Sequence, residues 1–176
     1  MKINAIVQVY PNKEQSQAIK NTIEKANNAC NLISQSAWDN RIFGQYSLHK
    51  LVYSQVREDT KLTAQVVVRC IAKVSDAYKL DKETVRTFKP YGAIAYDDRI
   101  LRWYTDKRIV SIWTVNGRQK ISFKCGIRQA YFLTFRHGET DLIYHDNKFF
   151  LSATCDIPNP TEQDVEDIIG VDMGIV

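Results

Sequence analysis

The chain has 176 residues, of which 44% are hydrophobic and 25% charged, the ordinary balance of a folded protein with one sizeable domain or two small ones. Its apolar runs are far too short for a membrane span, and its first residues lack the apolar core of a signal peptide. The four cysteines lie far apart, which argues against a zinc site of the Cys-x-x-Cys type and favours reduced, buried thiols in a cytoplasmic protein.

The charges are unevenly distributed, although the net charge is only +4. Residues 81–128 carry 11 Lys and Arg against 5 Asp and Glu, a balance of +6. Residues 137–167 carry 1 against 8, a balance of −7. This asymmetry predicts a polyanionic partner for the middle of the chain, and a connecting role for the acidic stretch.

The chain is expected to begin with one strand and a long helix. Apolar and polar residues alternate over residues 2–10, which is typical of a strand, and Pro11 ends it. Asn12 followed by Gln15 indicates a helix N-cap with a capping box. An apolar stripe in steps of three and four then continues to about Ile42.

Two shorter helices are expected next. Ser47 can cap the first of them, and Thr60 or Thr63 can begin the second. Because the connections are short, the three helices are expected to form an antiparallel bundle.

After Pro90 the period changes from helical to strand-like. Asn116-Gly117 predicts a hairpin with a type I′ turn, and Asp146-Asn147 predicts a second hairpin. A short helix is expected over 126–135. The expected strands cover residues 93–96, 100–104, 109–115, 119–124, 141–145 and 148–157.

The first strand is best accommodated in the same sheet as the later ones. The predicted fold class is therefore α+β, an antiparallel β-barrel interrupted by an inserted helical bundle. The expected division is a first barrel strand over 1–11, the bundle over 12–89, the rest of the barrel over 90–158, an acidic linker over 159–167 and a final strand over 168–176.

The final stretch, Ile-Ile-Gly-Val-Asp-Met-Gly-Ile-Val, has an aspartate in the middle of an apolar run. Aspartate is depleted in strands and costly to bury without a cation or hydrogen bonds. The pattern resembles the first strand of RNase H or RuvC-type nucleases, where the carboxylate holds a divalent metal. Asp172 would be that carboxylate. The alternative is a buried strand whose aspartate starts a turn.

Basic and aromatic residues are interleaved through the β-region. Lys and Arg can neutralise phosphates, and aromatic faces can stack on unpaired bases, which favours RNA as the ligand. The alternative is that half of these side chains simply face solvent, and that Trp103 and Trp113 belong to the barrel core. The candidate nucleic-acid contacts are Arg86, Lys89, Arg99, Arg102, Lys107, Arg108, Arg118, Lys120, Lys124, Arg128, Tyr96 and Trp103, with Tyr91, Tyr104 and Trp113 among them in the sequence.

The order of elements and several local phrases resemble the N-terminal half of the TnpB (OrfB) transposon-associated proteins, relatives of type V CRISPR effectors. The resemblance covers essentially the whole chain. It rests on Val9-Tyr10-Pro11 with Gln15, Leu48-His49-Lys50-Leu51-Val52, Ala93-Ile94-Ala95-Tyr96-Asp97-Asp98-Arg99, Asp141-Leu142-Ile143-Tyr144 with Phe149-Phe150-Leu151, and Gly170-Val171-Asp172-Met173-Gly174.

The resemblance implies an RNA-guided DNA endonuclease of prokaryotic, nucleoid-associated location. A wedge-like β-barrel and an inserted recognition bundle would hold the guide RNA and the target DNA. The stretch 168–176 would begin a RuvC-like domain that uses Mg²⁺, and Asp172 would be the first of its three catalytic carboxylates. The family's other two carboxylates and its zinc ribbon have no counterpart in these 176 residues.

Three interpretations remain open. The chain can be the N-terminal portion of such a nuclease, a stand-alone RNA- or DNA-binding protein without nuclease activity, or a structural module completed by a second polypeptide that carries the rest of the RuvC-like domain.

We expect these 176 residues alone not to cleave nucleic acid. Two-metal phosphodiester cleavage needs several carboxylates to fix the ions about 4 Å apart, and Mg²⁺ held by a single carboxylate is weakly bound. Incubation of the purified chain with DNA and Mg²⁺ should leave the DNA intact. A cut that requires both Mg²⁺ and Asp172, and that disappears in Asp172→Ala, would contradict this expectation.

Overall fold

The computed structural model describes residues 1–159. The strand expected over 168–176, with Asp172, and all but the first residue of the linker expected over 159–167 lie outside the described residues.

One strand, three helices and a series of antiparallel strands follow one another in the predicted order. Within residues 1–159 every expected helix and strand is present, including the short helix within 126–135, although β6 begins at Arg136 rather than at the expected residue 141. The elements are β1 (Lys2–Tyr10), α1 (Lys13–Asn40), α2 (Gln45–Thr60), α3 (Ala64–Leu80), β2 (Ile94–Tyr96), β3 (Leu101–Tyr104), the 3₁₀ turn η1 (Thr105–Lys107), β4 (Ile109–Thr114), β5 (Gly117–Lys124), α4 (Ile127–Leu133), β6 (Arg136–His145) and β7 (Lys148–Asp156).

The helix starts show which local signals are sufficient. The predicted capping box is confirmed, because the Gln15 amide donates to Asn12 Oδ1 at 2.8 Å and the Asn12 amide donates to Gln15 Oε1 at 3.0 Å. Thr63 is the N-cap of α3, so of the two predicted starts, Thr60 and Thr63, the second is confirmed. Ser47 as the cap of α2 is wrong. The extended backbone of Gly44 begins that helix, and its carbonyl accepts from the Leu48 amide at 2.9 Å.

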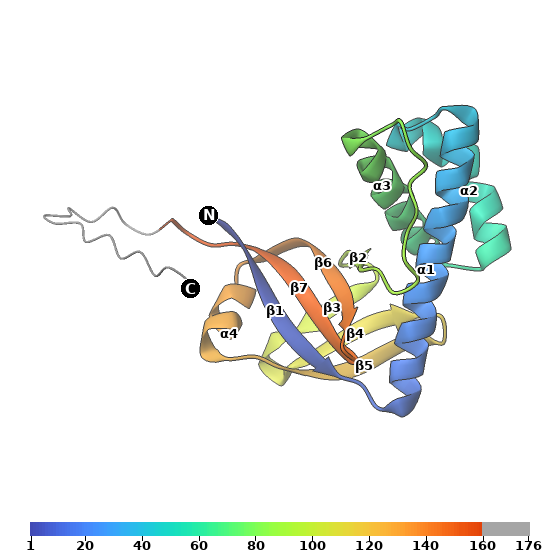
Figure 1. The fold of residues 1–176 in the computed structure, drawn as a ribbon. Helices are drawn as coiled ribbons and strands as arrows, with labels where there is room; N and C mark the ends of the chain where they lie inside the picture. Colours follow the sequence, from blue (N-terminus) through green and yellow to red (C-terminus); the bar gives the residue numbers. More distant parts are fainter. Residues whose placement is uncertain (160–176) are drawn as a thin grey trace, which may run out of the picture.

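The three long helices form a bundle beside the sheet (Figure 1). In Figure 1, α1 leads away from the barrel, α2 returns toward it and α3 runs away again, as expected of antiparallel neighbours. Tyr78 of α3 is fully buried, and its hydroxyl lies 3.0 Å from the Ser34 hydroxyl of α1. No helix within residues 1–159 combines the length and apolar character needed to cross a membrane.

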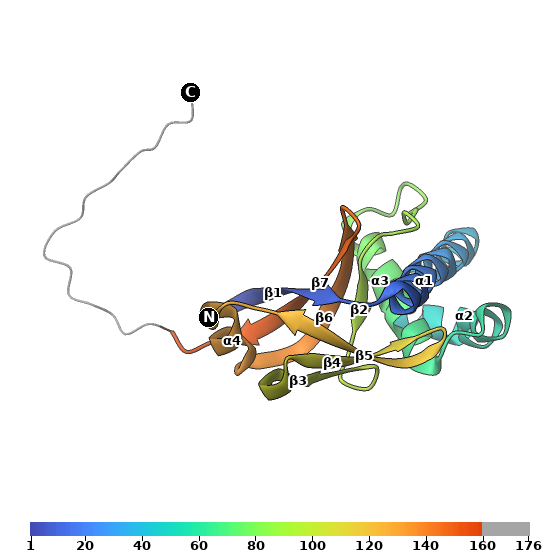
Figure 2. The ribbon, with the colours of Figure 1, turned by 90° about the horizontal axis from the view of Figure 1, so that it is seen from below.

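The seven strands form one antiparallel sheet that is nearly closed into a barrel, in the order β2-β6-β7-β1-β5-β4-β3 (Figures 1 and 2). β1 lies in the middle, between β7 and β5, so the strand before the bundle belongs to the same sheet as the strands after it. Side chains reach across the remaining gap, because Trp103 Nε1 of β3 donates to Thr140 Oγ1 of β6 at 3.4 Å.

Both predicted hairpins are present. Asp146 and Asn147 have φ of 47° and 59°, the pair of positive angles that a type I′ turn requires. At the first hairpin, the prediction of a type I′ turn at Asn116-Gly117 is wrong. The strand register pairs Thr114 with Gly117, and of the two predicted turn residues only Gly117 has a positive φ, of 92°.

Asn27 of α1 connects the bundle to the barrel. Its side chain is fully buried, and its Nδ2 donates to the carbonyls of Pro90 at 3.3 Å and Gly92 at 2.8 Å, just before β2. Its Oδ1 accepts from Lys73 Nζ of α3 at 2.7 Å. Lys73 also donates to the Ala93 carbonyl at 2.7 Å. One amide thus joins α1, α3 and the turn that enters the sheet.

We predict that Asn27→Leu lowers the free energy of unfolding by about 3 kcal/mol. The apolar side chain would leave the Lys73 ammonium and the backbone carbonyls without their buried partner. Urea unfolding followed by circular dichroism measures the change. Asn28→Leu is the matched control. Asn28 is the exposed neighbour of Asn27 on the same helix, so its replacement should alter the free energy of unfolding by less than about 0.5 kcal/mol. Equal stability of the two variants would refute this role of Asn27.

Candidate nucleic-acid interface

The strand register gathers basic residues on the outer face of β1, β5, β4 and β3. Arg102 lies opposite Ser111, and Ser111 lies opposite Lys120. Directly opposed residues point to the same face of a sheet, so these three form one row across three strands. The neighbouring residues Leu101, Ile112 and Ile121 are buried, whereas Arg102 and Lys120 are exposed, so the row faces outward with the small Ser111 buried between the two cations. We call the following set the basic outer face: Arg102, Arg118, Lys120, Lys124, Tyr10, Tyr104 and Trp113.

Aromatic side chains lie in the adjoining row of this face. Tyr104 is opposite Ile109, Ile109 is opposite Ser122, and Ser122 is opposite Tyr10. Tyr104 and Tyr10 are both 42% exposed, which leaves ring surface accessible. Lys124 Nζ lies 5.0 Å from the centre of the Tyr10 ring, within the range of a cation–π contact.

Arg118 fixes the position of its own charge on this face. Its Nη1 donates to the Ser111 carbonyl at 3.1 Å, and its Nη2 donates to the Arg99 carbonyl at 2.7 Å. Both acceptors are neutral carbonyls, so the guanidinium is held in place without losing its charge to a carboxylate. Arg99, at the β2–β3 turn, is thereby brought beside the basic outer face.

Most of the predicted basic contacts keep their charge unpaired. Of the ten, only Arg86 and Arg99 form an ion pair with a carboxylate within residues 1–159. Nearby carboxylates are engaged by other cations. Arg69 pairs with Asp97 and Glu139, and Arg136 pairs with Asp98. The face therefore presents cations that an anionic ligand can neutralise.

Arg86 and Lys89 lie apart from this face, in the segment between α3 and β2. Arg86 Nη2 is 2.6 Å from an oxygen of Asp81, and the Arg86 carbonyl accepts from Ser34 Oγ at 2.6 Å. Hydrogen bonds from the Glu83 amide and the Thr84 hydroxyl lower the pKa of Asp81, and the charge of Arg86 adds to this. These contacts make Arg86 a residue that holds the segment in place. Lys89 is exposed on it.

Three other predicted residues border the face. Lys107 and Arg108 occupy the turn between β3 and β4, and Arg108 Nη1 donates to the Cys125 carbonyl at 3.3 Å, beside Lys124. Arg128 of α4 lies over the Phe132 ring at 5.3 Å and lines a groove of about 360 Å³ along the start of β1.

Tyr96 and Trp103 both point into the barrel, and the assignment of Tyr96 as a base-stacking residue is corrected because its ring is buried. Tyr96 is 1% exposed, its hydroxyl donates to the Trp113 carbonyl at 3.0 Å, and burial raises its pKa. Trp103 points inward and packs edge-on against Phe123, with ring centres 5.3 Å apart. The Tyr96 ring is therefore closed to a base, and the Trp103 ring is half-buried against the core. Trp113, in contrast, lies opposite Arg118 on the outer face.

Sequence reasoning missed Tyr10 as a member of the face. Alternation along β1 indicates that Tyr10 points the same way as Ile6 and Gln8, but it does not indicate which strand lies beside it. The pairing of Tyr10 with Ser122, more than one hundred residues later, supplies that information.

Within residues 1–159, no group of three or more His, Cys, Asp or Glu side chains is placed so that it could hold a metal ion. Asp172, the carboxylate expected to bind Mg²⁺, lies outside the described residues.

A scan against protein-family models and a search of curated proteins found no match for this chain. The function must therefore be inferred from its residues and their geometry.

We predict that Arg102→Gln combined with Lys120→Gln changes the free energy of unfolding by less than about 0.5 kcal/mol, because neither side chain forms an ion pair within residues 1–159. Arg118→Gln should cost about 1–2 kcal/mol, because it removes two hydrogen bonds to backbone carbonyls. Thermal and urea unfolding measure both changes. A large loss in the double variant would show that the two cations serve the fold.

Proposed function

We propose that this chain is the nucleic-acid-binding N-terminal portion of a TnpB-type, RNA-guided DNA endonuclease, and that the basic outer face contacts the guide RNA. The observation that carries the proposal is the row formed by Arg102, Ser111 and Lys120, flanked by the exposed rings of Tyr10 and Tyr104. Cations without carboxylate partners beside accessible rings suit a ligand with both phosphates and unpaired bases.

RNA fits this combination better than duplex DNA. Arg and Lys bind phosphates of any nucleic acid, but a ring can stack only on a base that is not already stacked within a helix. Guide-like RNAs offer such bases in loops and at ends. Tyr104 and Tyr10 stand in the same row as small or aliphatic residues, Ser122 and Ile109, which leave room above the sheet for a planar base.

The arrangement of elements also supports the family proposal. A helical bundle inserted after the first strand of a β-barrel is what the resemblance implies, and target DNA would be the second ligand. Mg²⁺ belongs to the same proposal, as the cofactor of the RuvC-like domain of such a nuclease. A second polypeptide that carries the remaining RuvC-like residues belongs to the alternative in which this chain is a structural module.

The test is binding of a structured RNA with single-stranded loops, measured by fluorescence anisotropy over a range of salt concentrations. The variant Arg102→Gln/Lys120→Gln/Lys124→Gln should weaken binding and reduce the slope of log K against log salt by about 2, since each phosphate contact to a single strand contributes about 0.7. Tyr104→Ala should cost about 1–3 kcal/mol of binding free energy through lost stacking.

The matched control removes the same charge from other exposed positions. Lys50→Gln/Lys61→Gln/Lys82→Gln should retain most of the affinity, because these exposed side chains lie outside the sheet, on α2, directly after α2 and after α3. Tyr96→Phe should retain affinity as well, because its ring is buried. Equal losses in the two triple variants, or binding that does not depend on salt, would rule out a specific phosphate-binding role for this face.

A further inference from the structure

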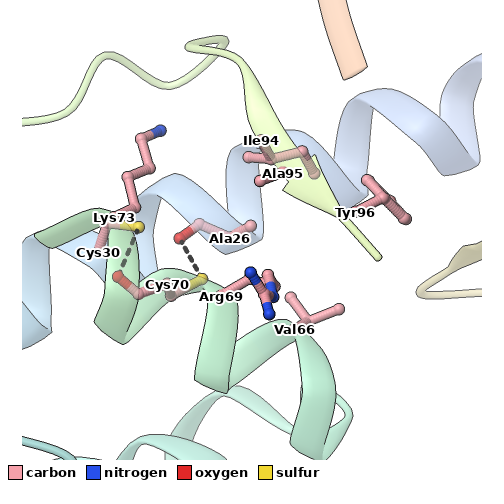
Figure 3. A pocket seen from close by; sticks show the side chains of 9 residues that line it. All are labelled: Ala26, Cys30, Val66, Arg69, Cys70, Lys73, Ile94, Ala95 and Tyr96. Atoms are coloured by element: carbon pink, nitrogen blue, oxygen red, sulfur yellow. Dashed lines mark hydrogen bonds between the residues drawn. The ribbon is translucent and has the colours of Figure 1, made fainter. Parts of the chain in front are cut away.

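Two buried cysteines face each other where α1 packs on α3 (Figure 3). Cys30 Sγ of α1 donates to the Cys70 carbonyl at 3.9 Å, and Cys70 Sγ of α3 donates to the Ala26 carbonyl, one turn before Cys30, at 3.4 Å. Each thiol therefore points at the other helix.

A small cavity adjoins this pair. It has a volume of about 10 Å³, and both thiols line it together with Arg69, Lys73 and Tyr96. That space admits about one water-sized molecule. Cys30 is fully buried and Cys70 is 4% exposed, so a reagent must be small to reach them.

The two thiols differ in their electrostatic surroundings. The hydrogen bond from Cys70 lowers the pKa of Cys30, and the Lys73 ammonium favours the same thiolate. The hydrogen bond to Cys30 and burial raise the pKa of Cys70. A thiolate is the nucleophilic form of cysteine, so Cys30 is suited to react first and Cys70 to resolve the product.

We propose that Cys30 and Cys70 form an oxidisable dithiol that hydrogen peroxide converts into a disulfide between α1 and α3. The Cys30 thiolate attacks one peroxide oxygen. The S–O bond forms, the O–O bond breaks, and the departing hydroxide takes the thiol's proton to give water. Cys70 sulfur then attacks the sulfenic sulfur of Cys30. The S–S bond forms, the S–O bond breaks, and the second hydroxide leaves as water with the proton of Cys70.

The disulfide would fix the bundle. It would close the chain from residue 30 to residue 70 across two helices, which removes conformational freedom from the unfolded state. It would also tie together the two helices that Asn27 and Lys73 connect to the barrel. The proposal does not depend on the nucleic-acid ligand.

The test treats the folded protein with hydrogen peroxide, alkylates the remaining thiols under denaturing conditions and maps the tryptic peptides by mass spectrometry. We expect peptide 26–41 to be linked to peptide 70–73, with a loss of two hydrogen atoms. We also expect the melting temperature to rise by about 5 °C and to return when dithiothreitol is added.

Two variants separate this outcome from general oxidation. Cys125→Ala removes a half-buried thiol elsewhere and should still form the linked peptide. Cys70→Ala should leave Cys30 as a sulfenic acid, which dimedone labels once the oxidised protein is unfolded in denaturant. Recovery of Cys30 and Cys70 from the wild-type protein as free thiols, or as unlinked sulfinic acids, overturns the proposal. This readout needs no variant to fold.

Discussion

The orientation of the bundle on the barrel depends on the buried amide of Asn27. The chain leaves the sheet after β1 and must return to it at β2, on the other side of β6 and β7. The segment that re-enters the sheet at β2 packs directly on Asn27, since a Cβ added at Gly92 would lie only 3.4 Å from Asn27 Oδ1. Asn27 Oδ1 also accepts a hydrogen bond from Lys73 of α3, so Asn27 contacts both the segment that enters β2 and helix α3. A buried amide that hydrogen-bonds to several groups favours one orientation of the bundle on the barrel, because any other orientation would leave those groups without hydrogen-bond partners.

The same helix also holds the strands that carry the basic outer face. Thr22 Oγ1 accepts from the Val115 amide at 3.0 Å, at the turn between β4 and β5. Gln15 Nε2 donates to the Lys120 carbonyl at 3.0 Å. α1 therefore contacts the barrel with its first half and the other helices with its second. A ligand that touches both the bundle and the basic outer face would meet two surfaces joined by one continuous helix.

Local signals predicted local structure well, and the failures have physical causes. The capping box of Asn12 and the turn at Asp146-Asn147 depend on neighbouring residues alone, so the sequence contains all that decides them. Ser47 failed as a cap because α2 already begins at Gln45, after the extended backbone of Gly44, which has no side chain to signal a cap. The inward orientation of Tyr96 could not be predicted, because alternation defines two faces of a strand without indicating which one is covered.

The candidate interface exists because of strand register. Along β5, Arg118, Lys120 and Lys124 alternate with residues that include Ile121 and Phe123, both buried at 2% exposure. A shift of one residue against β1 or β4 would turn these cations into the barrel and the apolar residues out to solvent, which makes the observed register strongly preferred. The hydrophobic core that selects the fold therefore also sets where the cations point. A motif search misses such a site, because its members become neighbours only when strands from distant parts of the chain pair.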